Sequence, residues 1–547
     1  MSTHEGHVGL AIARSLELHG VDRVFTVPGE SYLAVLDGLR DTGIRNVVCR
    51  QEGGAAYMAD AYGRATSSVG VAMVTRGPGA ANAFVAVHTA WQDASPLVLF
   101  VGLVPVPDRD REAFQEFDPR AWFGSQAKRV LILDNADRAS EVVAEAFHAA
   151  RSGRPGPVIV GLPEDVVASG FAGGLVEPYA TATGAIAPEH IAELQASIAG
   201  AERPLLFLAG EGWTDASATA VRTFAERHEL PVINDWHGTW RIPTTSPACI
   251  GQSAFGTAPH ATKALEEADL IVCFGGTLTD TPTDSFRITR AAGSQTIVIS
   301  GDAALRGHMG RVNRHYLATP EVLPAALAGI SALGIAASES RTAWSASLRT
   351  AYLASREVQA PAAPDGYASM TRVISQVAAQ FADPIVTMGA GNHGAWGALV
   401  HTTSPQSELG PRNGSMGYSI PAATAAALAR PNRNVLALAG DGEFLMNGQE
   451  LATAVQEGAA FLAVVMDNQQ FGTIRVHQER EYPGRVSGTQ VTSPDFAGLA
   501  AAYGAHAEDI SADDQISGAV TRAIAAVEAG RVALLHVHVD PAVLLPE

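Results

Sequence analysis

The sequence contains few cysteines and has no apolar run long enough to cross a membrane. Its three cysteines, Cys49, Cys249 and Cys273, are far apart and lie in or beside apolar segments. Thiols spaced in this way are typical of buried, reduced side chains, so neither a disulfide framework nor a cysteine metal site is expected. The apolar run at 98–106 is short and is broken by a glycine and a proline. A transmembrane helix of about 20 apolar residues is therefore excluded.

Basic side chains are also scarce relative to acidic ones. The 547 residues include 37 Lys and Arg against 56 Asp and Glu, which gives a formal charge of −19. An anionic surface repels nucleic acids and anionic membranes, so neither is an expected partner. Residues 1–5 show no basic stretch followed by an apolar one. A cytoplasmic protein without a signal peptide is therefore expected.

The chain is too long for one hydrophobic core, because single cores stop growing at about 250–300 residues. Three blocks, in which apolar segments alternate with helical ones, predict three doubly wound α/β domains with parallel sheets. Their expected bounds are 1–178, 188–340 and 362–547. Turn-prone segments at 180–187 and 359–366 are expected to link them.

Short apolar segments in each block are expected to form the strands. They are 23–27, 46–49, 70–74, 97–101 and 158–162 in the first block, 204–208, 231–233, 270–274 and 296–300 in the second, and 384–388, 434–439, 460–466 and 533–539 in the third. Helices are expected at 6–19, at 52–64, from about residue 80, and at 447–456.

The strongest chemical feature follows the expected strand at 434–439. That strand ends in Gly440-Asp441-Gly442, and the next one ends in Asp467-Asn468. Asp-Gly alone is more often only a turn. The interval of 27 residues between Asp441 and Asn468, however, suits one strand–helix–strand crossover, which would place both at the carboxyl edge of the sheet. A carboxylate and an amide oxygen are ligands that Mg²⁺ prefers, and Gly442 allows close approach of a phosphate.

A second feature lies in the first block. Glu52 stands where an apolar strand meets a helix of small residues that runs to Arg64. A glutamate in this place usually interacts with the helix dipole, and a role in chemistry needs a second observation.

Together the two features resemble the motifs of thiamine-diphosphate enzymes. These are Gly-Asp-Gly followed by Asn after an interval in the high twenties, and a Glu-x-x-Ala-x-x-Met-Ala-x-Gly/Ala-x-x-Arg pattern. The resemblance implies that Asp441, Asn468 and the carbonyl of Gln470 bind Mg²⁺, which holds the diphosphate. It also implies that Glu52 bonds to the pyrimidine ring of thiamine diphosphate and activates it. One departure is Asp467, where the family often has a first Asn.

The resemblance implies further contacts with the cofactor. The residues that match family positions are Pro28, Gly77, Asn82, Gly391, Asn392, His393, Gly414, Met416, Gly440, Gly442 and Glu443. Met416 would wedge the cofactor into its bent shape, although a core methionine is the alternative interpretation. The expected fold is a pyrimidine-binding domain, a middle domain and a diphosphate-binding domain.

Within the family, the sequence is most similar to the acetolactate synthase group. Ala113-Phe114-Gln115-Glu116 and the run from Phe444 to Leu451 carry this likeness. It implies that Phe114 and Gln115 border the reacting carbon, and that the substrate is a small 2-oxo acid or 2-hydroxy carbonyl compound. Active sites of this group combine two subunits, which implies a homodimer or homotetramer.

Three departures leave the reaction open. The segment at 275–280 lacks the Arg-Phe-acidic run of flavin-binding members and the nearby arginine for a second keto acid, so FAD is allowed but not implied. His477 stands where a tryptophan usually helps to select the acceptor. Glu30 replaces a glycine, and it is either a proton donor that favours an aldehyde product or an acid at a helix start. Proton handling is expected of Glu30, Gln115, His393 or His477.

The expected activity is decarboxylation of a 2-oxo acid followed by ligation to a second carbonyl compound. A 2-oxo acid decarboxylase and a 2-hydroxy-carbonyl lyase are the alternatives. A non-catalytic cofactor-binding relative is a third, and the presence of Glu52, Asp441 and Asn468 argues against it.

Overall fold

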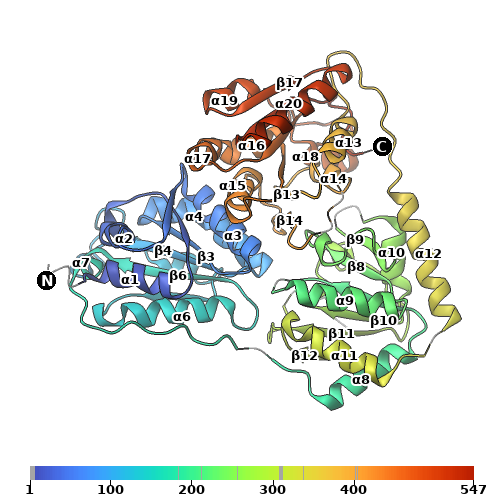
Figure 1. Cartoon of the computed structure of the whole chain (residues 1–547), viewed down its shortest axis with the longest axis horizontal. Helices are drawn as coiled ribbons and strands as arrows, with labels where there is room; N and C mark the ends of the chain where they lie inside the picture. The colour runs from blue at the N-terminus through green and yellow to red at the C-terminus, as the bar shows by residue number, and fades with distance from the viewer. Residues whose placement is uncertain are drawn as a thin grey trace.

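The computed structural model describes residues 6–182, 184–210, 212–254, 257–306, 312–336, 338–400, 402 and 404–546. Residues 1–5, on which the expectation about the N-terminus rests, and residue 183 of the first expected linker lie outside the described residues. The chain forms three α/β units around a common centre (Figure 1), each with a six-stranded, all-parallel sheet flanked by helices. This confirms the expected fold class, while the exact domain bounds stay predictions.

The N-terminal domain has the strand order β2-β1-β3-β4-β6-β5. Its strands are β1 (Arg23–Thr26), β2 (Arg45–Val48), β3 (Gly70–Val74), β4 (Leu97–Leu103), β5 (Arg129–Ile132) and β6 (Pro157–Pro163). Its helices are α1 (Val8–Leu18), α2 (Leu33–Leu39), α3 (Glu52–Thr66), α4 (Gly77–Asp93), α5 (Pro119–Phe123), α6 (Ala139–Arg151) and α7 (Glu164–Ala168). Helices α1, α2 and α6 pack on one face of the sheet, and α3 and α4 pack on the other.

The middle domain has the order β12-β11-β10-β7-β8-β9. Its strands are β7 (Pro204–Leu208), β8 (Val232–Asp235), β9 (Cys249–Ser253), β10 (Leu270–Phe274), β11 (Gln295–Ser300) and β12 (Arg314–Leu317). Its helices are α8 (Pro188–Gly200), α9 (Asp215–Arg227), α10 (Pro259–Glu267), α11 (Leu323–Leu333) and α12 (Glu339–Ser355). Helices α8, α9 and α11 cover one face, and α10 and α12 cover the other.

The C-terminal domain has the order β14-β13-β15-β16-β18-β17. Its strands are β13 (Ile385–Met388), β14 (Glu408–Leu409), β15 (Val435–Gly440), β16 (Leu462–Asp467), β17 (His506–Ile510) and β18 (Ala533–His538). Its helices are α13 (Met370–Gln380), α14 (Gly394–Gly397), α15 (Ser419–Ala429), α16 (Asp441–Asn447), α17 (Leu451–Glu457), α18 (Gly472–Glu481), α19 (Phe496–Ala502) and α20 (Ile516–Glu528). Helices α13, α14 and α20 share one core cluster, and α15, α17 and α19 share the other.

The helices around the expected site differ from the sequence-based expectation. Helix α4 begins at Gly77, so the Gly-Pro-Gly segment forms its first turn and does not precede it. Instead of one helix at 447–456, α16 begins directly at Asp441, and a 3-10 turn at Gly448–Glu450 separates it from α17. The direct passage from β15 into α16 makes Asp441 the first helical residue.

The cysteines and the longer apolar helices bear on two further expectations. All three cysteines are buried and free, as expected. Among the described residues, no helix has the length and apolar character that a membrane span requires.

The N- and C-terminal domains share one hydrophobic core, in which α3 packs beside α15 (Figure 1). The rings of Tyr57 and Tyr418 meet edge to face, with their centroids 5.2 Å apart. Glu450 Oε1 accepts hydrogen bonds from the backbone N–H groups of Arg50, at 3.0 Å, and Gln51, at 2.9 Å. The start of α3, where Glu52 lies, is therefore held by the C-terminal domain of the same chain.

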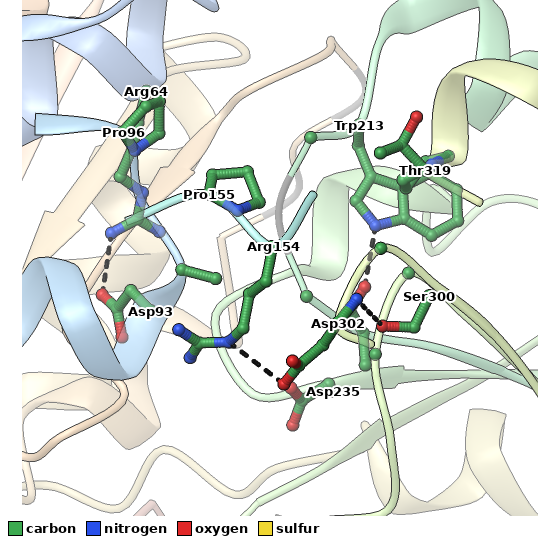
Figure 2. Close-up of a pocket in the computed structure, with 18 of the residues that line it drawn as sticks. Arg64, Asp93, Pro96, Arg154, Pro155, Trp213, Asp235, Ser300, Asp302 and Thr319 are labelled. Atoms are coloured by element: carbon green, nitrogen blue, oxygen red, sulfur yellow. Dashed lines mark hydrogen bonds and ion pairs between the residues drawn. The ribbon is translucent and has the colours of Figure 1, made fainter. Parts of the chain in front are cut away.

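All three domains meet at a buried junction of charged side chains. Arg64 contacts Asp93 at 3.2 Å, and Asp93 also accepts from the backbone N–H of Arg412 at 2.8 Å. The guanidinium of Arg412 reaches Asp235 of the middle domain at 3.3 Å. A cavity of about 370 Å³ lies beside this junction. Figure 2 shows Arg64 beside Asp93 at one side of this cavity.

Glu408, in strand β14, fastens the same junction to the middle domain. It accepts from the backbone N–H of Thr239 at 2.9 Å and lies 3.3 Å from Nδ1 of His237. Burial acts to raise the pKa of Glu408, but the bonds from His237 and Thr239 outweigh it and lower the pKa to about 2. The segment from Glu408 to Arg412 is thus anchored to both other domains, and it leads directly into the loop that carries Met416.

Replacing Glu408 by Ala should destabilise the whole chain. The change leaves His237 and the Thr239 N–H buried without their acceptor, and each such unsatisfied group costs about 1–3 kcal/mol. We expect a clear fall in the thermal unfolding midpoint, measured by scanning calorimetry. Glu141→Ala, which removes an exposed ion pair with Arg138 on the surface of α6, is the control and should change the midpoint little. Equal shifts for both variants would contradict the anchoring role.

Candidate active site

Two neighbouring strands deliver the expected metal ligands to one edge of the C-terminal sheet. Strands β15 and β16 are parallel and pair Gly440 with Met466, so the residues that follow leave the sheet side by side. Asp441 is 3% exposed and Asn468 is 6% exposed. Burial and the neighbouring Asp467 raise the pKa of Asp441. A cation bound at this edge would favour the ionised form of that carboxyl group.

Gln470, the third expected ligand, lies in a tightly held turn after Asn468. Gln469 has a φ of 55°, in the left-handed region, so the backbone reverses between Asn468 and Gln470. The carbonyl of Gln469 accepts from Val491 at 3.0 Å, and the N–H of Phe471 donates to Thr489 at 2.8 Å. These bonds hold the backbone on both sides of Gln470.

The segment after β13 converges on the same edge. The side-chain nitrogens of Asn392 and Asn468 each lie 3.3 Å from the position that a Cβ on Gly472 would take. Nδ2 of Asn392 is buried and has no hydrogen-bond partner among the described residues. A buried donor without an acceptor is costly, so it fits an anionic ligand such as a diphosphate.

His393 lies behind this edge and is 3% exposed. Its Nδ1 lies 3.2 Å from the position of a Cβ on Gly440 and 2.6 Å from that of one on Gly391, so both glycines leave room for the ring. Burial lowers the pKa of His393 to about 4. The ring is therefore neutral near pH 7 and can exchange hydrogen bonds there without carrying charge.

Gly442 and Glu443 face neighbouring protein groups. A Cβ on Gly442 would lie 2.6 Å from the ring of Phe471. Glu443 is buried and accepts from the N–H groups of Gly417, at 2.9 Å, and Ser419, at 3.1 Å. Burial raises the pKa of Glu443 to about 7. In this structure Glu443 therefore holds the loop that carries Met416.

The expected pyrimidine-side residues gather at one end of the N-terminal domain. Glu52 is the first residue of α3, and its Oε2 accepts from Asn82 at 2.9 Å. Its Oε1 lies 3.3 Å from the position of a Cβ on Gly79. The carbonyl of Gln115 lies 2.8 Å from the corresponding position on Gly77, so Gln115 packs against the first turn of α4. These residues come from three separate segments.

Pro28 and Glu30 lie at the border of this group. Pro28 is exposed, and the next residue, Gly29, packs so closely on Thr75 that a Cβ would lie 2.5 Å from the Thr75 side chain. Glu30 starts a 3-10 turn, Glu30–Tyr32, and its carboxylate meets Arg76 at 2.7 Å. This position matches the helix-start alternative, and a role as proton donor stays a prediction.

The residues around Glu52 and those around Asp441 form two half-sites, and exposed apolar side chains border both of them. Val85 and Phe114 are 40% and 73% exposed near Glu52, and Leu445, Met446 and Ile474 are 50%, 50% and 53% exposed near Asp441. Large apolar side chains gathered around polar groups often mark a protein interface.

Several residues at the sheet edge that carries the expected metal ligands Asp441 and Asn468, called the metal edge below, were not expected from the sequence. Ser493 lies 3.4 Å from Asp441 and donates to Asp467 at 2.6 Å, and Thr473 donates to Asn392 at 2.8 Å. Ser493 follows an irregular segment without a motif, so no sequence signal marked it. Its position depends on the folding of 489–493 back onto the turn at Gln469.

Comparison with known proteins agrees with this geometry. Three family models match the chain: the N-terminal TPP binding domain of thiamine pyrophosphate enzymes at residues 7–122, their central domain at 191–321, and their C-terminal TPP binding domain at 389–537. The acetolactate synthase isozyme 2 large subunit of Escherichia coli is 30% identical over 536 residues, 97% of this chain and 95% of that protein.

Two further relatives extend the comparison. The acetolactate synthase large subunit of Parasynechococcus marenigrum is 32% identical over 90% of this chain and 82% of its own length. A probable acetolactate synthase large subunit of Methanocaldococcus jannaschii is 30% identical over 98% of this chain and 92% of its own length. The fold and these matches together show that the chain belongs to the thiamine pyrophosphate enzyme family.

Proposed function

We propose that this protein releases CO₂ from a 2-oxo acid and joins the remaining acyl unit to a second carbonyl compound, as an acetolactate synthase does. The proposal is carried by one observation. Asp441 and Asn468 follow the paired ends of β15 and β16 in a chain that aligns with an acetolactate synthase large subunit over 97% of its length. The intact Glu52 half-site supports the same function.

The metal edge would hold the cofactor through Mg²⁺. Asp441, Asn468 and the carbonyl of Gln470 are oxygen ligands of the kind that Mg²⁺ prefers, and Asn392 Nδ2 is a donor for a diphosphate oxygen. When bound, thiamine diphosphate supplies a nucleophilic carbon that adds to a carbonyl group and accepts the electrons left by departing CO₂.

Residues of the N-terminal half-site would handle protons and border the substrate. Glu52, oriented by Asn82, would hold a proton at the pyrimidine ring nitrogen. Gln115 would contact the substrate with a neutral amide. Glu30 would have to leave Arg76 before it could donate a proton. The neutral ring of His393 would serve as a hydrogen-bonding group.

A second copy of the chain would complete each active site, so we propose a homodimer or a pair of such dimers. In one chain Glu52 is only half-buried, and Asn82 beside it is exposed. The exposed Val85 and Phe114 near Glu52, and Leu445 and Met446 near Asp441, would be buried by such pairing.

The proposed function does not require FAD. Decarboxylation and ligation involve no net oxidation or reduction of the substrates, and the segment at 275–280 lacks the Arg-Phe-acidic run. The cavity beside the carboxyl ends of β7, β10 and β11 is the place in the middle domain where a nucleotide-bearing molecule would fit.

The reaction can be tested with purified protein, Mg²⁺, thiamine diphosphate and pyruvate. We expect CO₂ release and formation of acetolactate. Acetaldehyde as the only product would contradict ligation and favour the decarboxylase, which Glu30 would then explain. Absence of CO₂ release from pyruvate and from a panel of other 2-oxo acids would contradict decarboxylation as a whole.

Glu52→Gln should lower kcat by about 10³, because general acid–base groups contribute about 10²–10⁴. Cofactor binding, measured by isothermal titration calorimetry, should stay close to that of the unchanged protein. Asp441→Asn is the matched comparison, since it should weaken Mg²⁺-dependent cofactor binding itself. A normal rate in Glu52→Gln would remove Glu52 from its assigned role.

Sharing of the active site between subunits predicts complementation. Glu52→Gln and Asp441→Asn should each be inactive alone. A heterodimer of the two, isolated from co-expression with two different tags, should recover about half the activity, because one of its two sites combines an intact Glu52 with an intact Asp441. A heterodimer without activity would show that both residues act within one chain.

A further inference from the structure

Asp467 is a buried carboxylate at the position where the family often has an asparagine. Its side chain is 2% exposed, and so it needs hydrogen-bond donors in place of water. Nε2 of His536 lies 3.0 Å from Oδ2 of Asp467, and the His536 side chain is 3% exposed. His536 belongs to β18, which pairs with β16 in the sheet. Nδ1 of His536 faces Asp509 Oδ1 at 3.0 Å, so the ring lies between two carboxylates, of which Asp467 is the buried one.

The second oxygen of Asp467 is occupied as well. Oδ1 accepts from Ser493 Oγ at 2.6 Å and from the backbone N–H of Gln469 at 3.2 Å. With donors on both oxygens, Asp467 is held in one orientation. It is therefore placed to orient the segments around the expected ligands.

One neighbour of Asp467 Oδ1, Gln469, lies between two expected ligands, and the other, Ser493, lies beside the third. Gln469 adopts a left-handed φ of 55°, a conformation that costs a non-glycine residue about 1–2 kcal/mol. The bond to Asp467 stabilises this turn, which places Asn468 and Gln470 on either side of Gln469. Ser493 lies 3.4 Å from Oδ2 of Asp441, so it links Asp467 to the third ligand.

We propose that Asp467 and His536 form a positioning pair that presets the Mg²⁺ site. His536 fixes Asp467, and Asp467 in turn fixes the Asn468–Gln470 turn directly and Asp441 through Ser493. The inference rests on the proposed function only in taking Asp441, Asn468 and Gln470 as the metal ligands. Groups that orient metal ligands typically change metal affinity about 10–100-fold when they are altered.

The geometry of the pair dictates which substitutions it tolerates. An asparagine at 467 has one acceptor and one donor, so it would place its NH₂ group against either His536 or the Ser493 and Gln469 donors. A glutamine at 536 can donate to Asp467 as the imidazole does, and after rotation of its amide it can accept from an asparagine. Phenylalanine at 536 offers no donor at all.

These relations define a double-mutant cycle with Mg²⁺ affinity as its readout. Mg²⁺ is titrated calorimetrically into the full-length protein that contains thiamine diphosphate. Asp467→Asn and His536→Phe should each raise the Mg²⁺ Kd about 10–100-fold. His536→Gln should stay within about threefold of the unchanged protein, and the Asp467→Asn/His536→Gln double variant should recover most of the lost affinity.

His506→Gln is the matched control, because His506 lies on the neighbouring strand β17 opposite Ala533, at the other end of β18, and bonds to Glu508 at 2.9 Å. It should leave the Mg²⁺ Kd unchanged. Circular dichroism of each variant without Mg²⁺ checks that it is folded, and kcat at saturating Mg²⁺ should fall far less than the affinity does. A general folding defect would lower both together and would not be relieved in the double variant.

Two outcomes would overturn the proposal. One is Mg²⁺ binding by Asp467→Asn with an unchanged Kd. The other is a second metal equivalent that disappears in His538→Gln, since Asp467, His536 and His538 have ligand atoms within 4.8 Å of one another and His536 would then be a ligand itself. Failure of the proposed function has a different signature, namely normal Mg²⁺ binding without turnover of any 2-oxo acid.

Discussion

The site depends on the register between two parallel strands. Because Gly440 pairs with Met466, β15 and β16 end together, and the carboxylate of Asp441 and the amide of Asn468 leave the sheet at one edge. A shift of one residue would turn one of these side chains to the opposite face of the sheet. The continuous apolar packing of both strands against helices on each face holds this register. The packing of the core thus fixes the positions of Asp441 and Asn468.

Most buried polar groups around that edge have hydrogen-bond partners within the protein. Asp467 is satisfied by His536, Ser493 and Gln469, while Glu443 is satisfied by the loop at Gly417–Ser419. By contrast, Asn392 keeps a buried donor without a partner among the described residues. Satisfied groups hold the shape of the site, and the unsatisfied donor indicates where a ligand would bind.

Contacts between domains also hold the segments around Glu52, the second half-site, in place. Glu450 holds the start of α3, while Glu408 and Arg412 tie the segment before Met416 to the middle and N-terminal domains. The contacts between the three domains therefore fix the relative positions of residues that are far apart in the sequence. Exposed apolar side chains beside each half-site are consistent with the proposed pairing of two copies of the chain.

The sequence by itself determined the three α/β domains, the interior strands and the two motifs around Glu52 and Asp441, because buried strands have continuous apolar runs and the motifs have fixed spacing. It did not indicate the edge strands β5, β9, β12, β14 and β17, since an edge strand such as His506–Ile510 packs less apolar surface and lacks such a run.

Only the tertiary structure brought Ser493 and His536 to Asp467, paired Glu30 with Arg76, and turned Glu443 toward the Met416 loop. Those contacts join segments far apart in the chain, and their partners are chosen by packing and by the need of buried polar groups for hydrogen bonds, which local sequence patterns do not encode.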